Sequence, residues 1–473
     1  MIIPHSSENL ALADQQCHSY RELTEKSHGT CSALLKDRED LIEERIAFLI
    51  SPGFAYVATL FGIWKAGGIA VPMSPKHPLT ELMHIVNEVS VTRIICDPPH
   101  RKLAEQCGIP VLSTEQLLSS SETKLMPTLE DHRRALILFT SGSTGRPKGV
   151  VTTHANIRAQ VDSLLEAWEW TSTYRILHVL PLHHIHGIVN VLLCSLKAGA
   201  VCEFSHPFQP DVVWDRMASG EISLFMAVPT IYSRLIKTFE QASTQEQNRW
   251  SQGARSMRLH VSGSAALPVP VLEKWESITG QRLLERYGMT EIGMALSNPY
   301  RGERRPGFVG EPLPGVEVRL AKETGEIEVR GPNVFLEYWN RSEETSASFR
   351  EGWFCTGDIA VYEEGYRILG RSSVDIIKTG GYKVSALEIE AVLREHDLIE
   401  DCAVVGVTDS EWGERVALCL VGDPSLTLSM IREWAKERLA SYKVPSKMRR
   451  VEKLPRNAMG KVQKHLVRQL IES

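Results

Sequence analysis

The sequence of 473 residues lacks the usual marks of secreted, zinc-binding and nucleic-acid-binding chains. Its nine cysteines include no C-x-x-C pair, so we expect free thiols in a reducing compartment. A formal net charge of −5 gives no electrostatic reason to propose nucleic acid as a partner. The N-terminus has no basic region followed by an apolar stretch and is not arginine-rich. We therefore expect a cytoplasmic protein, with an organellar form left open.

Long hydrophobic runs are also scarce. One uncharged run, residues 46 to 64, approaches the length of a membrane span. Ser51-Pro52-Gly53 interrupts it with turn residues, which predicts a buried strand, a turn and a buried helix instead. No internal repeat or low-complexity tract is present. We expect no membrane span.

Short apolar runs alternate with helical patterns through the first three hundred residues, as in "RIAFLI", "LTELMHIVNEVS" and "ALILFTSG". Such alternation predicts an α/β fold, with parallel-rich sheets covered by helices. Near residue 307 the pattern changes to polar-alternating hairpins, which predicts a small β-unit. A small mobile α+β domain is expected last. The polar stretch "GRSSVD" places the boundary between a large domain, 1–370, and a small one, 371–473.

The most informative stretch is "LILFTSGSTGRPKGV", residues 136 to 150. An apolar strand is followed by three glycines, four hydroxyl residues and two cations. Small residues let backbone N–H groups approach an anion, hydroxyls add donors, and Arg146 and Lys148 offset phosphate charge. The spacing differs from the P-loop pattern G-x-x-x-x-G-K-[ST]. A flexible surface loop is the alternative interpretation.

This loop resembles the phosphate loop of the adenylate-forming enzymes, which include acyl-CoA synthetases, firefly luciferase and the adenylation domains of peptide synthetases. Five more stretches resemble motifs of that family, in the family's order along the chain. They are "YGMTE" (287–291), "GWFCTGD" (352–358), "GR" (370–371), "KTGGYKVSALEIE" (378–390) and "LPRNAMGKVQK" (454–464). The resemblance implies a two-step reaction in which a carboxylate attacks the α-phosphorus of ATP and coenzyme A then displaces AMP.

The resemblance also implies roles for particular residues. Lys461, Thr290 and Glu291 would be catalytic, with Glu291 and Thr144 holding Mg²⁺, a cation that takes oxygen ligands. Taken alone, Lys461 would be interpreted as a solvated surface lysine. The residues expected to bind ATP or AMP are Thr140, Ser141, Gly142, Ser143, Thr144, Gly145, Lys148, Ser264, Glu285, Arg286, Tyr287, Gly288, Thr290, Asp358, Arg371 and Lys461.

Similar enzymes rotate their small domain between the two half-reactions. The resemblance places the coenzyme A tunnel at Gly380, Gly381 and Tyr382, and the hinge at Ser373. The segment "GRSSVDIIK" is one residue longer than the usual hinge. ATP, Mg²⁺ and coenzyme A are therefore the expected cofactors and co-substrates. We expect small-molecule partners only, and a monomer or homodimer.

The acid is predicted from Arg286, which stands directly before the "YGMTE" motif. A dicarboxylate needs a paired cation for its second carboxylate, and arginine offers a bidentate fork. Together with "VSGSAALP" and "PGFVGEPLPGVEVRL", this stretch resembles the malonyl-CoA synthetase branch. The resemblance implies a malonate–CoA ligase that also accepts methylmalonate, with Arg286 and Ser264 on the distal carboxylate. His184 and His186 border the expected acyl pocket.

Several alternatives stay open at this point. Arg286 could instead pair with Glu285 or another acid and brace the loop. Arg301, Arg304 and Arg305 are rival cations, and the histidines could be satisfied residues at a strand end. A medium- or long-chain fatty acyl-CoA synthetase would use the same two-step mechanism. A non-catalytic nucleotide-binding protein and an adenylation domain that loads a carrier protein in trans are further possibilities.

Overall fold

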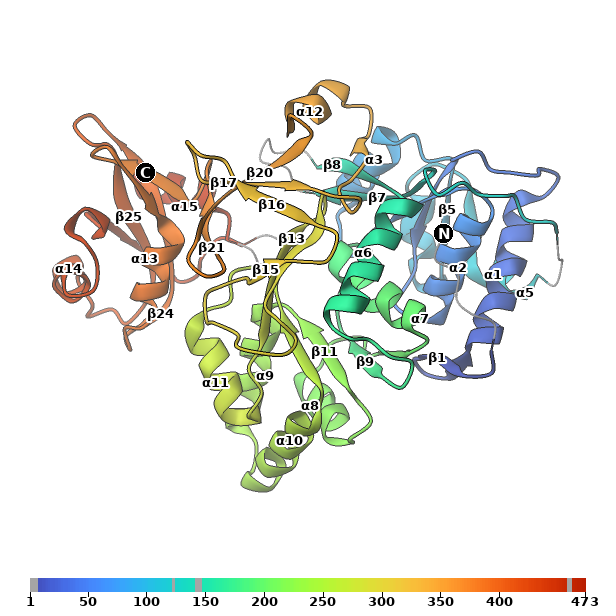
Figure 1. Cartoon of the computed structure of the whole chain (residues 1–473), viewed down its shortest axis with the longest axis horizontal. Helices are drawn as coiled ribbons and strands as arrows, with labels where there is room; N and C mark the ends of the chain where they lie inside the picture. The colour runs from blue at the N-terminus through green and yellow to red at the C-terminus, as the bar shows by residue number, and fades with distance from the viewer. Residues whose placement is uncertain (1–6, 121–123, 141–146, 457–461) are drawn as a thin grey trace.

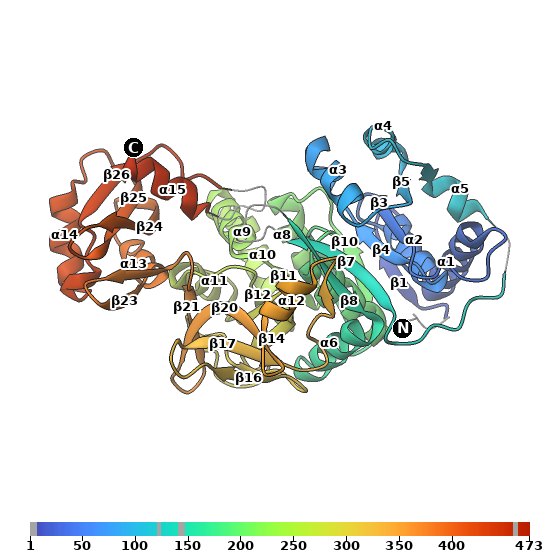
Figure 2. The same ribbon diagram turned by 90° about the horizontal axis from the view of Figure 1, so that it is seen from above.

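The computed structural model describes residues 7–120, 124–140, 147–456 and 462–473. Figure 1 shows a broad body that contains two parallel-rich sheets and their helices, and a smaller α+β unit at the C-terminal end of the chain. The view from above agrees, with the small unit and the N-terminal helices at opposite ends of the molecule (Figure 2). The predicted α/β fold with a small α+β unit is confirmed.

The first sheet has seven strands and an inner core of parallel pairings. β3 pairs in parallel with β4 and β5, while β8 and β18 add antiparallel strands at one edge. In spatial order its strands are β18 (Glu337–Tyr338), β8 (Lys148–Thr153), β7 (Arg134–Thr140), β4 (Ile69–Pro72), β3 (Arg45–Leu49), β5 (Arg93–Cys96) and β6 (Val111–Ser113).

The second sheet has nine strands and is parallel from β1 to β13. Antiparallel strands close both edges. In spatial order its strands are β15 (Glu311–Pro312), β14 (Gly293–Ser297), β13 (Leu284–Met289), β12 (Leu259–Ser262), β11 (Leu224–Ala227), β9 (Arg175–His178), β10 (Val201–Phe204), β1 (Leu10–Ala13) and β2 (Cys17–Ser19).

The central parallel strands of both sheets are buried on both faces, as expected where helices cover a parallel sheet. In β3, Ile46 and Phe48 belong to the core shared by the two sheets, while Ala47 and Leu49 pack in a second core on the opposite face. The helices of this body are α1 (Tyr20–Leu35), α2 (Phe54–Lys65), α3 (Leu79–Glu88), α4 (Arg101–Glu105), α5 (Thr114–Ser119), α6 (His154–Ala167), α7 (Cys194–Ala198), α8 (Pro210–Ala218), α9 (Pro229–Gln241), α10 (Thr244–Ser256) and α11 (Val269–Thr279).

Three short helical segments of the described chain are not α-helices. A 3-10 turn, η1 (Pro98–His100), precedes α4, and a π-helix, η2 (His186–Leu193), leads directly into α7. The third is η3 (Ser441–Lys443) in the small unit. The segment that was tested as a membrane span forms β3 and α2, as the turn residues predicted. Within the described ranges, no helix is both long enough and apolar enough to cross a membrane.

A five-stranded antiparallel sheet forms the predicted β-unit after residue 307. It contains β16 (Glu317–Leu320), β17 (Glu326–Arg330), β19 (Phe349–Arg350), β20 (Trp353–Tyr362) and β21 (Tyr366–Arg371), and α12 (Ser342–Ala347) precedes β19. Both predicted hairpins are present, because β16 pairs with β17 and β20 with β21. This sheet carries the motif that ends at Asp358.

The last sheet forms the small unit and is covered on both faces. One face packs on α13 (Ala386–Leu393) and α14 (Leu428–Lys436), and the other packs on α15 (Lys464–Glu472). Its strands are β22 (Ile376–Thr379), β23 (Tyr382–Ser385), β24 (Ile399–Asp409), β25 (Gly413–Gly422) and β26 (Lys447–Arg450). Residues 372–375 join β21 to β22. The domain boundary at residue 371 stays a prediction.

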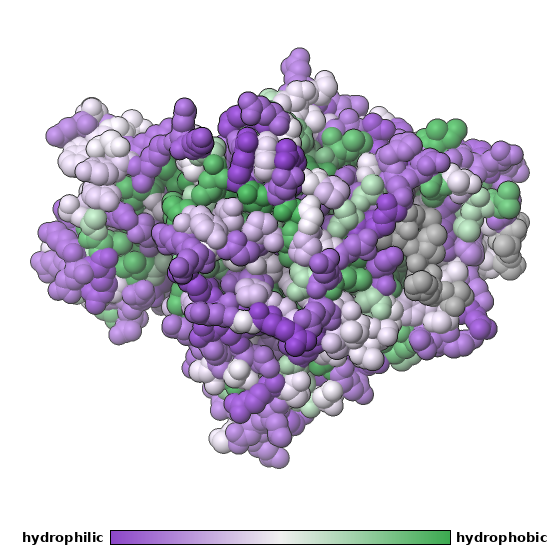
Figure 3. All heavy atoms as spheres, viewed as in Figure 1, coloured by the Kyte–Doolittle hydropathy of each residue, from purple (hydrophilic) through white to green (hydrophobic). Residues whose placement is uncertain are grey.

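The surface and the cysteines fit an ordinary globular protein. Figure 3 shows a mostly hydrophilic face on which hydrophobic side chains gather in separate groups. All nine cysteines are free, and seven of them are buried. The expectation of free thiols is therefore confirmed.

Candidate active site

The glycine-rich loop connects two paired strands. β7 and β8 are antiparallel, and Thr140 lies opposite Lys148 at the end of the ladder. Both ends of the predicted phosphate loop are therefore brought together where β7 ends and β8 begins. The predicted residues Ser141, Gly142, Ser143, Thr144 and Gly145 lie outside the described residues, so their role stays a prediction.

Lys148 lies in a cluster with Glu344 and Tyr338. Its ammonium forms an ion pair with the Glu344 carboxylate. The Lys148 Nζ atom also lies 5.2 Å from the centre of the Tyr338 ring, within cation–π range. Neither partner was predicted, and both lie about two hundred residues away along the chain. The cation that the sequence assigns to the phosphate loop is therefore paired with a carboxylate in this structure.

Glu291 is buried beside the same tyrosine. Glu291 is only 6% exposed, and Tyr338 Oη donates to Glu291 Oε1 at 3.0 Å. Burial raises the pKa of Glu291. A bound cation would offset that cost, and carboxylate oxygens are ligands that Mg²⁺ takes. The chemistry of this carboxylate thus fits the predicted metal ligand.

Tyr287, Asp358 and Arg371 meet between the nine-stranded sheet and the antiparallel sheet. Tyr287 Oη donates to Asp358 Oδ2 at 2.6 Å, and Arg371 Nε donates to Asp358 Oδ1 at 3.0 Å. Burial and the neighbouring Asp358 raise the pKa of Tyr287, so the phenol stays a donor. Each carboxylate oxygen can accept further bonds. The arrangement therefore brings together three of the predicted nucleotide-binding residues.

The backbone of the "YGMTE" motif is fixed by a hairpin. β13 turns into antiparallel β14 through residues 290–292, and the register shifts between Tyr287 and Gly288. A Cβ at Gly288 would collide with the carbonyl oxygen of Gly293, so this position requires glycine. Thr290 lies at the partly buried turn, next to Glu291. The tight pairing places the hydroxyl and the carboxylate at the same strand end.

Arg286 is a buried cation with unused donors. The residue is 2% exposed, and neither Nε nor Nη1 has a hydrogen-bond partner in the described protein. Nη2 lies 3.4 Å from Ser264 Oγ, to which it donates. Burial lowers the pKa of Arg286 to about 9, which leaves the guanidinium charged at neutral pH. A buried charge of this kind is costly unless it is paired.

Gly263 and Ser264, after β12, shape the space around this guanidinium. A Cβ at Gly263 would collide with the Arg286 side chain, so glycine makes room for it. Ser264 has a φ of 69°, in the left-handed region that non-glycine residues adopt at a cost. Its Oγ lies 3.2 Å from His186 Nδ1 and also accepts from Arg286. Gly263 was not predicted as a site residue, although the string "VSGSAALP" contains it.

The two predicted histidines are incompletely bonded; His186 is buried and His184 is half-buried. Nε2 of His186 and Nε2 of His184 both lack a hydrogen-bond partner in the described ranges. Burial lowers the pKa of His184 to about 4. Burial, together with the nearby Arg286, lowers the pKa of His186 well below its usual value. Both imidazoles are therefore neutral at pH 7. Neither imidazole is therefore the fully hydrogen-bonded histidine at a strand end that was the alternative interpretation.

Glu285 does not neutralise Arg286. Adjacent residues of a strand point to opposite faces, and Glu285 accepts instead from the backbone N–H of Leu267 at 3.3 Å. Burial raises the pKa of Glu285 to about 8. In the described part of the chain, no acidic side chain pairs with Arg286. The alternative in which Arg286 braces the loop through an ion pair is therefore wrong for these residues.

The rival arginines are engaged elsewhere. Arg301 forms an exposed ion pair with Glu169, with 2.5 Å between Nη2 and Oε2. Arg304 donates to three backbone carbonyl oxygens, and Arg305 donates to two. Arg286 alone among these four arginines combines burial with unpaired donors.

The predicted coenzyme A loop lies at the tip of the β22–β23 hairpin. Gly380 and Gly381 have φ angles of 54° and 82°, so both adopt the left-handed conformation that favours glycine. Tyr382 is 54% exposed and stacks on Tyr442 with 4.2 Å between ring centres. Ser373 lies in the turn between β21 and β22. These roles stay predictions, as does that of Lys461, which lies outside the described residues.

The described residues do not form a metal centre from protein side chains alone. Across the described ranges, no group of three or more histidine, cysteine, aspartate or glutamate side chains could hold a metal ion. The rings of His183 and His184 contact each other in a tilted arrangement, with 4.2 Å between ring centres. Any Mg²⁺ at Glu291 would thus need further ligands from solvent or from a bound nucleotide.

Comparisons with known proteins agree with this geometry. The AMP-binding enzyme family model matches residues 5–339, and the model of its C-terminal domain matches residues 388–461. A mitochondrial malonate–CoA ligase of Bos taurus is 45% identical, over 99% of this chain and 89% of that protein. The crystal structure of ATP-bound MatB from Rhodopseudomonas palustris is 33% identical, with a TM-score of 0.88, over 98% of this chain and 95% of that chain.

A second solved structure is a malonyl-CoA ligase in a ternary product complex with methylmalonyl-CoA and AMP. It is 34% identical, with a TM-score of 0.72, over 96% of this chain and 99% of that chain. The family model matches most of the sequence, and the bovine relative matches nearly all of it. This chain belongs to the AMP-binding enzyme family.

Proposed function

We propose that this protein is an ATP-dependent malonate–CoA ligase that forms malonyl-CoA, AMP and pyrophosphate. The observation that carries the proposal is Arg286, a buried guanidinium with two unpaired nitrogens beside Ser264. The names of the bovine relative and of the malonyl-CoA ligase structure support it independently. A second carboxylate on the substrate is the counter-ion that this arginine lacks.

Malonate suits the site because its two carboxylates have different tasks. One carboxylate attacks the α-phosphorus of ATP, the bond to pyrophosphate breaks, and malonyl adenylate forms. The distal carboxylate stays on Arg286, where a charge-assisted bond is worth more than in water. His186 stays neutral beside it and donates or accepts one further bond.

In the second step the thiolate of coenzyme A attacks the acyl carbonyl, and AMP leaves. Negative charge gathers on oxygen in both steps and needs fixed donors. We assign Lys461, Thr290 and Lys148 to the phosphate oxygens, and Tyr287, Asp358 and Arg371 to the nucleoside. The ion pair of Lys148 with Glu344 would open when phosphate binds.

Glu291 would hold Mg²⁺, with Thr144 as a second ligand from outside the described residues. The ion would neutralise the phosphate charge that builds up during adenylate formation. Tyr338 orients the carboxylate through its bond to Glu291 Oε1.

The coenzyme A tunnel is assigned to Gly380, Gly381 and Tyr382, in a small domain that begins at residue 371 and turns about Ser373. Their exposed hairpin tip and the stack of Tyr382 on Tyr442 support this assignment. Rotation of the small domain would bring either Lys461 or this tip to the adenylate.

Methylmalonate is proposed as a second substrate. The structure of a malonyl-CoA ligase with methylmalonyl-CoA supports this, and one extra methyl group gives only modest discrimination. A medium- or long-chain fatty acid is the weaker alternative. Its tail would leave Arg286 buried without a counter-ion.

The test is a pyrophosphate-release assay with malonate, methylmalonate, succinate, acetate and octanoate, each with ATP and Mg²⁺. Malonate should give the highest kcat/KM, and coenzyme A should convert the adenylate to malonyl-CoA. Activity with octanoate and none with malonate would contradict the proposal and favour the fatty acyl-CoA synthetase.

Oligomeric state and compartment complete the proposal. The protein is proposed to act as a monomer or homodimer, and light scattering on the purified protein would measure its oligomeric state. The sequence predicted a cytoplasmic protein, whereas the name of the bovine relative supports a mitochondrial one. Cell fractionation would decide between them.

A further inference from the structure

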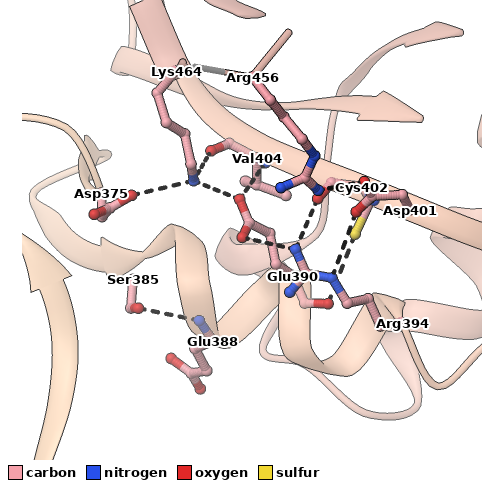
Figure 4. Close-up of polar contacts among 10 residues, drawn as sticks. All are labelled: Asp375, Ser385, Glu388, Glu390, Arg394, Asp401, Cys402, Val404, Arg456 and Lys464. Atoms are coloured by element: carbon pink, nitrogen blue, oxygen red, sulfur yellow. Dashed lines mark hydrogen bonds and ion pairs between the residues drawn. The ribbon is translucent and has the colours of Figure 1, made fainter. Parts of the chain in front are cut away.

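A second buried cation lies in the small unit, three residues after Lys461. Lys464 begins α15, and its side chain is only 10% exposed. Its Nζ atom contacts Glu390 Oε1 at 2.5 Å, the carbonyl oxygen of Val404 at 2.8 Å and Asp375 Oδ1 at 3.2 Å (Figure 4). An ammonium group has three donors, and all three are used.

The other end of the segment 457–461 is also anchored. Arg456 Nη2 contacts Asp401 Oδ2 at 2.6 Å. Arg456 forms an antiparallel bridge with Val462, and the Gln463 backbone N–H donates to the carbonyl oxygen of Pro455 at 2.9 Å. The two residues that flank the segment are therefore held side by side.

Arg394, which follows α13, joins the two anchors. Its Nη2 donates to Glu390 Oε2 at 3.3 Å and to the carbonyl oxygen of Cys402 at 2.9 Å. Its Nε lies 4.0 Å from Asp401 Oδ1. Figure 4 shows Arg394 below the carboxylates of Glu390 and Asp401, with Lys464 and Arg456 above them. One network thus holds both ends of the segment.

The same network reaches the predicted hinge. Asp375 Oδ2 accepts from the backbone N–H of Arg371 at 3.1 Å. Arg371 in turn donates to Asp358, a residue that we assign to the nucleoside. Lys464 therefore connects the segment that contains Lys461 to the turn where the small domain begins.

We propose that Glu390 and Lys464 are positioning residues for adenylate formation, which hold the segment that carries Lys461 in register with the hinge. The proposal rests on the proposed function, because it assumes that Lys461 serves the first half-reaction. A misplacement of about 1 Å in a catalytic group can cost roughly 100-fold in rate. The carboxylates of Glu390 and Asp375 also neutralise Lys464, so that this second ammonium does not compete with Lys461 for anionic oxygens.

The test separates the two half-reactions in the full-length protein. Glu390→Gln and Lys464→Met are assayed for malonate-dependent ATP–pyrophosphate exchange, which needs only adenylate formation. They are then given malonyl adenylate and coenzyme A, which needs only thioester formation. Exchange should fall about 30-fold or more, while thioester formation stays within about threefold of the wild type.

A purely structural role predicts a different result. The coenzyme A hairpin belongs to the same small unit, so a damaged fold would lower both half-reactions equally. Equal loss in both, or no loss of exchange, would overturn the proposal. Arg456→Gln keeps the test valid if the first two variants misfold. The Arg456 side chain is 38% exposed, so its replacement disturbs the fold less. It should show the same asymmetry, with exchange lowered about fivefold.

Glu388→Gln is the matched control. Glu388 lies on the same helix, α13, but pairs with Lys443 at 2.6 Å, and Figure 4 shows its carboxylate pointing away from Glu390. Both half-reactions of this variant should stay within about twofold of the wild type. If the wild type shows no exchange with malonate, the proposed function fails. The same variants are then assayed with the acid that the substrate assay identifies, so that the positioning proposal is still tested.

Discussion

Two buried cations of this protein have opposite surroundings. Arg286, on β13 of the large body, has two guanidinium nitrogens without a partner in the described residues. Lys464, at the start of α15, has an oxygen on each of its three donors, two of them carboxylates. A buried charge without a counter-ion raises the energy of the free protein, whereas a paired one supports the fold. The difference supports the proposal that Arg286 binds an anionic ligand, whereas Lys464 is already paired within the protein.

The largest expected effect on stability is at Lys464. Lys464→Met leaves buried Glu390 with only its longer contact to Arg394, at 3.3 Å, and breaking a buried pair costs about 3–5 kcal/mol of folding free energy. Denaturant unfolding of the small unit would measure this loss. Lys443→Met, which breaks the more exposed pair with Glu388, should cost less than about 1 kcal/mol. Equal losses would remove the contrast between paired burial and surface pairing.

A second test concerns pH, because His184, a candidate residue of the acyl pocket, is neutral at pH 7. Burial lowers the pKa of His184 from 6.5 to about 4. Between these values the unfolded chain binds a proton that the folded protein does not, so stability is full above pH 6.5 and is lost as pH falls towards 4. From pH 7 to pH 5 this one group accounts for about 2 kcal/mol. The unfolding free energy of His184→Gln should therefore fall less steeply than that of the wild type as the pH is lowered. Parallel curves for the two proteins would contradict the lowered pKa of His184.

Arg286→Leu should stabilise the unliganded protein, opposite in sign to Lys464→Met. Leucine removes an uncompensated charge from a buried position, which we expect to add about 1–2 kcal/mol. Thermal unfolding without substrates measures the change. Arg301→Leu is the control, since Arg301 forms an exposed ion pair and its loss should alter stability by less than about 0.5 kcal/mol. A destabilised Arg286→Leu would mean that Arg286 braces the fold after all.

The smallest expected effect is at Ser264. Ser264→Ala removes one hydroxyl next to Arg286 Nη2, and a single hydrogen bond is worth about 1 kcal/mol. The KM for malonate should rise roughly fivefold, with little change in the KM for ATP. Steady-state kinetics with each substrate varied in turn would detect it. An equal rise in both constants would place Ser264 outside the acid pocket.

Much of the fold could be predicted because its signals are local. The run of residues 46 to 64 contains its own turn, so β3 and α2 could be recognised without knowing their neighbours. The hairpins β16–β17 and β20–β21 likewise follow from alternation around short turns. The candidate site residues could likewise be predicted, because the family motifs are short local stretches that occur in a fixed order along the chain.

Partners far apart in the sequence could not be predicted. Tyr338 reaches Glu291 across 47 residues, and Lys464 reaches Glu390 across 74. No local pattern encodes such pairings, because they depend on how separate sheets and helices pack. The same reasoning applies to Arg286: its position was visible in the sequence, but its missing counter-ion could be seen only in the folded protein.

The central claim is that the substrate's second carboxylate supplies that counter-ion. Its most direct test is the ratio of kcat/KM for malonate to that for butyrate, in which an ethyl group replaces one carboxylate. We expect the wild type to prefer malonate, and Arg286→Leu to lower the malonate value roughly 1,000-fold while the butyrate value stays the same or rises. An equal loss for both acids would contradict the claim.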